Sequence, residues 1–131
     1  MFQKLIFVGN LGRDPELRYT SGGKPVTTLS VAVNNQYTNA QNEPVKETTW
    51  FRVSVWDKQA EACAQYLAKG RQVLVEGRLQ ADPSTGGPRL FERNDGTMGA
   101  AFEVNASAVR FLGGKSEGNG NGQDAADEIP L

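Results

Sequence analysis

The sequence predicts an all-β fold: a small barrel of five strands with one helix between the third and fourth strands. Three observations support this. Most apolar segments alternate with a period of two, which is typical of half-buried strands, whereas one segment has helical spacing. Runs rich in glycine, proline and other turn-forming residues separate these segments. With 131 residues, 38% of them hydrophobic, the chain can fill one core but not two.

The strands are expected between residues 2 and 112, and turn-forming residues set their ends. The first strand is apolar on both faces, which indicates a strand covered on both sides. The second and third strands alternate between apolar and polar side chains. In chain order, the expected strands are Phe2–Leu11, Val26–Asn34, Thr48–Trp56, Arg71–Gln80 and Ala101–Leu112.

Three segments between these strands are expected to form turns and loops. Gly12–Gly23 contains Asp-Pro and Gly-Gly turn signals. Asn34–Glu47 is expected to be a polar loop, with Tyr37 and Val45 as its apolar anchors. Asp82–Gly99 is rich in glycine and proline, so we expect a long hairpin tip or loop there.

One segment, Lys58–Lys69, has the spacing of a helix. Asp57 is expected to cap its N-terminus, and Gly70 is expected to end it in the left-handed conformation. Cys63 lies on the apolar stripe of this helix, so we expect a small buried core residue rather than a reactive thiol. The stripe consists of Ala60, Cys63, Ala64 and Leu67.

The order of three strands, one helix and two strands is that of the OB-fold, a five-stranded Greek-key barrel. Another small β-barrel is the alternative, and the position of the helix favours the OB-fold. The folded domain is expected over residues 1–112. From Gly113 the chain becomes rich in glycine and asparagine, so residues 113–131 are expected to form a disordered, flexible linker with an acidic tip.

The charge is unevenly distributed along the chain. All 14 basic residues lie in the first 115 residues, which hold 11 of the 15 acidic residues. The body is therefore mildly basic and the tail acidic, although the whole chain has a net charge of −1. A weakly positive body is compatible with a polyanionic partner.

The residue types that the sequence lacks disfavour several functional classes. It has no histidine and one cysteine, so neither a Cys/His zinc site nor a Ser-His-Asp triad can form within one chain. We therefore expect no enzyme, no metal and no cofactor. One cysteine allows no intrachain disulfide, and no apolar run reaches the ~20 residues of a membrane helix. With no signal peptide expected, the sequence fits a cytoplasmic protein.

The strongest candidate for a binding surface is one face of the third strand. Because successive side chains point to opposite faces, Trp50, Arg52, Ser54 and Trp56 share the face away from the core. Two flat π surfaces beside a guanidinium suit a nucleic-acid strand, whose bases stack on aromatic rings and whose phosphates bind cations. Packing of the tryptophans under a loop or in a subunit interface is the alternative. The core face carries Phe51, Val53 and Val55.

Further residues are candidates to extend this surface. Each basic side chain is either part of a phosphate-binding groove or a solvated surface charge. Tyr37, in its polar loop, is either a stacking group or a surface residue. The basic candidates are Arg13, Arg18, Lys24, Arg71 and Arg78, with Lys46, Arg89 and Arg93 as further members.

The acidic tail ends in a short apolar segment. Such a peptide suits a pocket with a basic rim, where apolar burial and charge pairing hold its end. A purely solubilising tail is the alternative. The residues of this tip are Asp127, Glu128, Ile129, Pro130 and Leu131.

Four stretches of the sequence resemble the bacterial single-stranded-DNA-binding proteins (SSB): KLIFVGNLGRDPELRYTSGGKPV, ETTWFRVSVWDKQAEACAQYLAKGRQVLVEGRL, AVRFLGG and DEIPL. The resemblance implies that Trp50 stacks on a base, that Trp56 replaces a stacking aromatic that is often phenylalanine, and that Tyr37 lies near a loop aromatic of similar role. Two departures stand out. No tryptophan follows the fourth strand, where Phe91 is the candidate to replace it, and the chain ends in Leu131 where phenylalanine is typical.

The resemblance also implies a function. It predicts a cofactor-free protein that binds and protects single-stranded DNA in replication, recombination and repair, as a homo-oligomer, usually a tetramer, in the cytoplasm at the nucleoid. The acidic tip would recruit helicases, nucleases and polymerase-associated proteins. The alternative is an OB-fold protein-interaction module, such as a primosomal accessory protein. A metal-dependent nuclease would need a carboxylate cluster, whereas the acidic residues are scattered along this chain.

Overall fold

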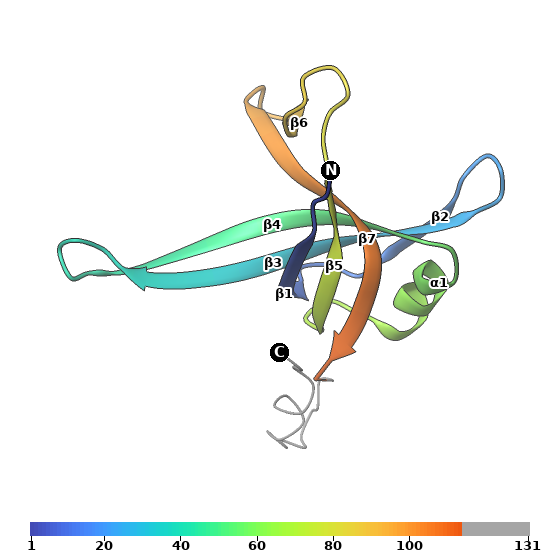
Figure 1. Ribbon diagram of the computed structural model, residues 1–131, viewed down its shortest axis with the longest axis horizontal. Coiled ribbons are helices and arrows are strands. Elements are labelled where there is room, and N and C mark those ends of the chain that lie inside the picture. Colours follow the sequence, from blue (N-terminus) through green and yellow to red (C-terminus); the bar gives the residue numbers. More distant parts are fainter. Residues whose placement is uncertain (114–131) are drawn as a thin grey trace.

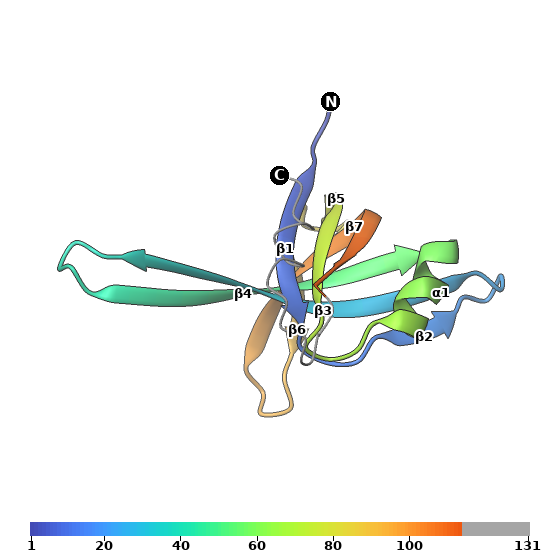
Figure 2. The ribbon, with the colours of Figure 1, turned by 90° about the horizontal axis from the view of Figure 1, so that it is seen from below.

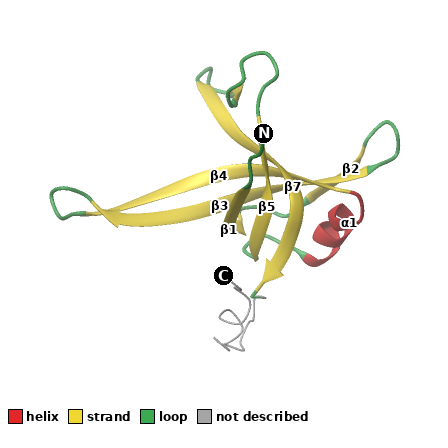
Figure 3. Ribbon diagram, in the orientation of Figure 1, coloured by secondary structure: helices red, strands yellow, loops and turns green. Residues whose placement is uncertain are grey.

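The computed structural model describes residues 1–113, which form mostly strands with one short helix (Figure 3). Five strands form the barrel, and they are the five expected strands with shifted ends. They are β1 (Leu5–Leu11), β3 (Pro25–Thr38), β4 (Pro44–Trp56), β5 (Gln72–Gln80) and β7 (Met98–Leu112).

The barrel closes because the first and last strands of the sheet pair with each other (Figure 1). The strands run in the order β1-β5-β7-β4-β3, and β1 then pairs with β3 through Asn10 with Ala32 and Leu11 with Val31. β4 and β7 run parallel, whereas the other neighbours are antiparallel. The predicted OB-fold, with its helix between the third and fourth barrel strands, is confirmed.

The barrel interior is filled by side chains that alternate along the strands. Removing each of these aliphatic side chains from water stabilises the fold by about 1.5–3 kcal/mol. The helix is tied to this core by a polar contact, since Thr27 Oγ1 donates a 2.7 Å hydrogen bond to the carbonyl oxygen of Ala60. Among the fully buried side chains are Leu29, Val31, Val53, Val55, Val73, Val75 and Val104.

The helix α1 (Asp57–Tyr66) differs from the predicted helix at both ends. Asp57 is the first helical residue rather than the cap, and no side chain caps the helix. Its φ of 60° turns the chain sharply out of β4, in a conformation that aspartate tolerates better than most residues. The helix ends early because Leu67 is extended and buried in the core. Gly70 has the expected positive φ, 92°, but in the turn before β5.

The clearest pKa shifts in residues 1–113 belong to structural groups. Cys63 is fully buried, as predicted, and the loss of hydration raises the pKa of its thiol to about 11. Hydrogen bonds from Ser84 lower the pKa of Asp82, and hydrogen bonds from Thr97 lower that of Asp95. The two aspartates therefore fix the turns on either side of β6 (Arg89–Glu92). Over the same residues, no helix is long and apolar enough to cross a membrane, and no acidic or cysteine side chains gather into a metal-binding group.

The prediction of a polar loop between β3 and β4 is wrong. Both strands continue as a two-stranded arm, paired from Asn34 with Thr48 to Thr38 with Pro44 (Figure 1, cyan and green). The arm projects beyond the barrel and has no core to face, so its mostly polar sequence lacks the alternation that marks a half-buried strand. Cross-strand contacts such as the 2.8 Å hydrogen bond from Thr48 Oγ1 to Asn34 Oδ1 hold it together.

Two short strands also lie in segments predicted as turns and loops. β2 (Glu16–Tyr19) pairs with the start of β3, and β6 pairs with the start of β7. As a result β7 begins at Met98 instead of Ala101. Four residues are too few to show a period, so neither strand has a sequence signal. The segment from residue 81 to residue 101, here called the β6 hairpin, rises from the barrel (Figure 1).

The outer face of β1 is open, although the sequence predicts a strand covered on both sides. Phe7 and Leu11 point into the core, whereas Ile6 on the opposite face is 52% exposed. β5 pairs along one edge of β1, but β3 contacts the other edge only at Asn10 and Leu11. Figure 2 shows β1 and β5 side by side at this side of the barrel. Within residues 1–113, the prediction of a second cover over this face is therefore not met.

Candidate nucleic-acid interface

The outer face of β4 carries the predicted aromatic pair. Trp50 is 52% exposed and Trp56 is 41% exposed, whereas Val53 and Val55 on the opposite face are buried. Arg52 lies between the tryptophans on their face. Six residues at about 3.3 Å each separate the two indoles by about 20 Å along the strand. The predicted shared face therefore exists, and both rings are accessible in the single chain.

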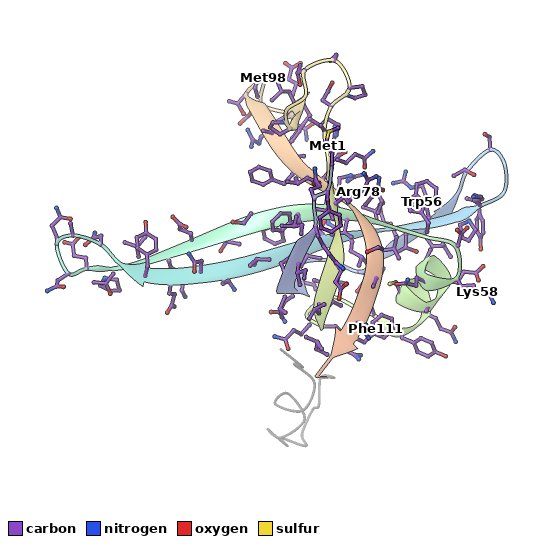
Figure 4. The ribbon with its side chains drawn as sticks, viewed as in Figure 1. Met1, Trp56, Lys58, Arg78, Met98 and Phe111 are labelled. Carbon is purple, nitrogen blue, oxygen red and sulfur yellow. The ribbon has the colours of Figure 1, made fainter. Side chains whose placement is uncertain are left out.

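Trp56 is held by the neighbouring strand. Its Nε1 donates a 3.3 Å hydrogen bond to Asn105 Oδ1 on β7, where Asn105 lies beside Ser54. Arg78 on β5 is the register partner of Asn105, so it lies on the same outer face. Figure 4 labels Arg78 near the crossing of these strands and Trp56 farther to the right, toward β2. The barrel thus places a cation from β5 on the face that carries this tryptophan.

Trp50 lies over a glycine at the end of β1. A Cβ atom on Gly12 would come within 2.5 Å of Cζ3 of the Trp50 ring, so no other residue fits without moving the indole. Gly12 is fixed in turn, because its backbone N–H donates a 2.9 Å hydrogen bond to the carbonyl oxygen of Ser30. One side of the Trp50 ring therefore rests on backbone, and the exposed part is left for a ligand.

Arg52 belongs to an ion-pair network. Its Nε lies 3.7 Å from Glu103 Oε2 on β7, and Nε of Arg89 on β6 donates a 2.6 Å hydrogen bond to the same oxygen. Glu103 is the register partner of Arg52. The outer side chains of four strands together form a continuous surface, which we call the β4 face: Trp50, Arg52, Ser54, Trp56, Arg78, Arg89, Glu103 and Asn105.

The β6 hairpin extends this surface with a second aromatic and basic group. The guanidinium carbons of Arg89 and Arg93 lie 5.6 Å and 5.5 Å from the centroid of the Phe91 ring, within the range of cation–π attraction. The ring and Arg93 lie over Gly99, where an added Cβ would come within 2.7 Å of both side chains. Phe91 therefore orients two cations beside the β4 face.

Arg18 lies on the same face of the sheet as Trp56. Arg18 on β2 is the register partner of Val26, which is itself the partner of Trp56. Arg18 also forms an exposed 3.6 Å ion pair with Glu16. In water such a pair contributes little energy, so it leaves the guanidinium able to bind a phosphate.

Other predicted site residues lie elsewhere. Tyr37 is on the arm, on the face opposite to that of Trp50, and its hydroxyl donates a 3.3 Å hydrogen bond to Glu47. Arg71 is partly buried beyond the far end of α1, where Nη1 donates to the carbonyl oxygen of Tyr66.

Two further predicted cations are exposed in turns that flank the barrel. Arg13 follows β1, next to the glycine beneath Trp50, and Lys24 precedes β3. Both are accessible to a ligand that passes the β1–β2 and β2–β3 connections. The predicted tail, residues 113–131, lies outside the described residues except for its first residue.

Comparison with known proteins identifies the family. The model of the single-strand binding protein family matches residues 2–112. This chain belongs to that family. The single-stranded DNA-binding protein of Neisseria meningitidis is 36% identical over 117 residues, which cover 89% of this chain and 63% of the relative. The protein of the same name from Halalkalibacterium halodurans is 40% identical over 124 residues, which cover 92% and 68%.

Solved structures agree with the family and the fold. The Plasmodium falciparum SSB in complex with ssDNA has 28% sequence identity and a TM-score of 0.69, over 86% of this chain and 97% of that one. The small single-stranded DNA-binding protein from Streptomyces coelicolor shares the fold at 24% identity and a TM-score of 0.66, over 83% and 93% of the two chains. This SSB-family chain spans 63% of the length of its Neisseria relative.

Three residues of the β4 face and its support were not predicted in this SSB-family chain: Gly12, Glu103 and Asn105. The alternation along the fifth strand does place Glu103 and Asn105 on one face. Their meeting with β4 depends on which strands are neighbours in the barrel, which alternation does not give. The contact of Gly12 with Trp50 joins the end of β1 to β4 and has no local signal.

Proposed function

We propose that this protein binds single-stranded DNA without sequence preference, across the β4 face and the β6 hairpin. The observation that carries the proposal is the exposure of Trp50 and Trp56 on one face, with Arg52 between them. Bases stack on both indoles, and phosphates pair with the guanidinium groups around them. Because every base has a π-face, stacking of this kind does not select a sequence, and each stack contributes about 1–3 kcal/mol.

Charge and similarity support the same ligand. The β4 face holds three arginines, Arg52, Arg78 and Arg89, against one carboxylate, Glu103. The β6 hairpin adds Arg93 and also carries Asp82, Glu92 and Asp95. Arg18 and Lys24 extend the positive charge past Trp56. The Plasmodium relative is described in complex with single-stranded DNA, and the relatives named above are DNA-binding proteins rather than enzymes.

The test is a titration of intrinsic tryptophan fluorescence with oligo(dT) at low and high salt. The chain has only two tryptophans, so the signal reports on the proposed site alone. We expect strong quenching whose affinity falls steeply with salt, because bound DNA releases counterions. If the protein neither quenches nor binds at low salt, the proposed function is wrong, and the OB-fold serves protein interaction instead.

We propose further that residues 1–112 form the DNA-binding and oligomerisation domain, with homotetramers as the assembly. Among residues 1–113, β1 keeps an edge that β3 pairs only at Asn10 and Leu11, and this edge beside the exposed Ile6 supports pairing with a second copy. The known family assembly implied by the sequence resemblance supplies the number of subunits.

The acidic tip, Asp127 to Leu131, is proposed to recruit proteins of replication, recombination and repair. Two carboxylates beside an apolar end support this, as does the sequence resemblance to the SSB tip. Deleting residues 114–131 should preserve binding to oligo(dT) and abolish binding to a nuclease or helicase partner in surface plasmon resonance. A substitution of Leu131 by phenylalanine is the matched control, which we expect to retain or strengthen partner binding.

A further inference from the structure

Glu103 lies where two arginines of the β4 face converge. Its Oε2 accepts a 2.6 Å hydrogen bond from Nε of Arg89 and lies 3.7 Å from Nε of Arg52. The Glu103 side chain is 20% exposed, whereas those of Arg52 and Arg89 are 45% and 43% exposed. A mostly enclosed carboxylate thus faces two accessible guanidinium groups.

The two arginines come from strands that do not pair with each other. Arg52 lies on β4 and Arg89 on β6, and β7 with Glu103 runs between them. Two guanidinium groups that point to one oxygen form a site that fits any oxyanion, and a phosphodiester carries the same kind of oxygen. Glu103 therefore occupies an anion subsite that the chain itself has built.

The surroundings leave room for the carboxylate to move aside. Glu103 lines an open pocket of about 310 Å³ at the base of the β6 hairpin, together with Gln80, Pro88 and Phe102. Gln80 is the register partner of Glu103, so its amide offers a polar neighbour there. A phosphate can therefore replace the carboxylate without moving the backbone.

We propose that Glu103 is a resident competitor for DNA phosphate, which holds Arg52 and Arg89 in place in the free protein and is displaced from them when the strand binds. This inference rests on the proposed function. It assigns the pair of arginines as a phosphate subsite and Glu103 as the residue that limits its affinity. With Glu103 in place, the three side chains carry a net charge of +1. Without its charge, they carry +2 and attract the polyanion more strongly.

The test is to measure oligo(dT) affinity of wild type and Glu103→Gln across a salt series. Glutamine keeps the shape and can still accept a hydrogen bond from arginine, but it removes the charge that competes with phosphate. We expect about three- to tenfold tighter binding at low salt. The slope of log K against log salt should become steeper by about 0.7, as for one more neutralised phosphate on a single strand.

Glu61→Gln is the matched control. It removes the same charge from an exposed position on α1, outside the β4 face. If the two variants change affinity and salt slope equally, the effect is one of net charge and the inference is wrong. If Glu103→Gln weakens binding, Glu103 orients the arginines instead of competing with DNA, which also overturns it.

Repeating the measurement in the Arg52→Met variant separates this inference from the proposed function. In Arg52→Met, the gain from Glu103→Gln should shrink toward that of the Glu61 control, because the subsite has lost one guanidinium. An undiminished gain would overturn the assignment of the subsite. If wild type does not bind oligo(dT), the proposed function and the inference about Glu103 both fail. If wild type binds tightly but Glu103→Gln does not change the affinity, only the inference about Glu103 fails.

Discussion

Two exposed surfaces of the barrel differ in what surrounds their apolar side chains. Trp50 on the β4 face and Ile6 on β1 are equally exposed, at 52% each. Trp50 shares its face with Arg52, and β4 is paired with β3 along its length and with β7 from Phe51 to Ser54. Around Ile6, no strand among residues 1–113 pairs with the second edge of β1.

The difference shows that exposure alone does not indicate a partner. A flat aromatic ring beside a guanidinium group fits bases and phosphates. An aliphatic side chain on an open strand edge instead fits a strand of another protein chain, which satisfies the backbone and buries the apolar group together. This contrast supports the two proposals, that DNA binds at the β4 face and that a second copy of the chain binds at β1.

The largest effect should come from a charge on β1. Ile6→Glu would place an unpaired carboxylate in the proposed subunit contact, at a cost of at least about 2 kcal/mol for each copy. Multi-angle light scattering should then show monomers where wild type is an oligomer, while each chain still binds a short oligo(dT).

Tyr66→Glu adds the same charge at an exposed position on α1 and should leave the assembly intact. A monomeric wild type, or an Ile6→Glu variant that remains fully assembled, would remove β1 from the interface.

The next effect should come from the tryptophans. Trp50→Ala and Trp56→Ala should each weaken oligo(dT) binding by about 1–3 kcal/mol, because each loses a stacking surface, and the oligomer should persist. Fluorescence anisotropy with labelled DNA measures this without relying on the tryptophans.

Tyr66→Ala, which removes an exposed aromatic ring outside the β4 face, is the control and should bind as wild type does. If a tryptophan variant dissociates into monomers while its affinity per chain is unchanged, that tryptophan belongs to a subunit interface, and the two surfaces have been assigned the wrong way round.

A smaller effect should follow from the support beneath Trp50. Gly12→Ala forces the indole to move, because the new Cβ would lie 2.5 Å from its ring. We expect a loss of about 1 kcal/mol in DNA affinity, less than from removing the ring.

In a Trp56→Phe background the emission reports on Trp50 alone and should shift in Gly12→Ala. Gly22→Ala, in the β2–β3 turn with space for a Cβ, should change neither emission nor affinity. An unchanged emission in Gly12→Ala would show that the glycine does not position the ring.

The smallest effect is expected at Cys63, which lies on neither surface and therefore reports on the core. Its raised thiol pKa of about 11 predicts slow labelling by a thiol reagent at pH 8 in wild type and in all the variants above. Rapid labelling in any variant would mean that its core has opened and that its binding data do not report on the surface.

The raised pKa of the Cys63 thiol also makes the stability of the protein depend on pH. Because the folded thiol holds its proton more tightly than the unfolded thiol, wild type should lose stability as the pH rises from about 9 to about 11. Cys63→Ala lacks this loss, so denaturant unfolding should show the stability of the two proteins converging or crossing over that range.

The alternation along β4 was enough to predict which side chains point outward. Trp50, Arg52 and Trp56 share a face in the structure because the period of two is a local property of an extended chain. The order of strands and helix likewise predicted the barrel. The arm and the strands β2 and β6 were missed, since polar or very short strands bury too little apolar surface to leave a pattern.

By itself, therefore, the sequence determined the barrel, the buried thiol of Cys63 and the aromatic face of β4. The contacts between side chains of different strands depended on how the barrel closes. Barrel closure brought Gly12 beneath Trp50 and Asn105 to Trp56, and it set Glu103 between arginines of two strands. The physical reason is that alternation fixes the side of a strand on which a residue lies, whereas its neighbours depend on strand order and register, which arise only when the whole chain packs around one core.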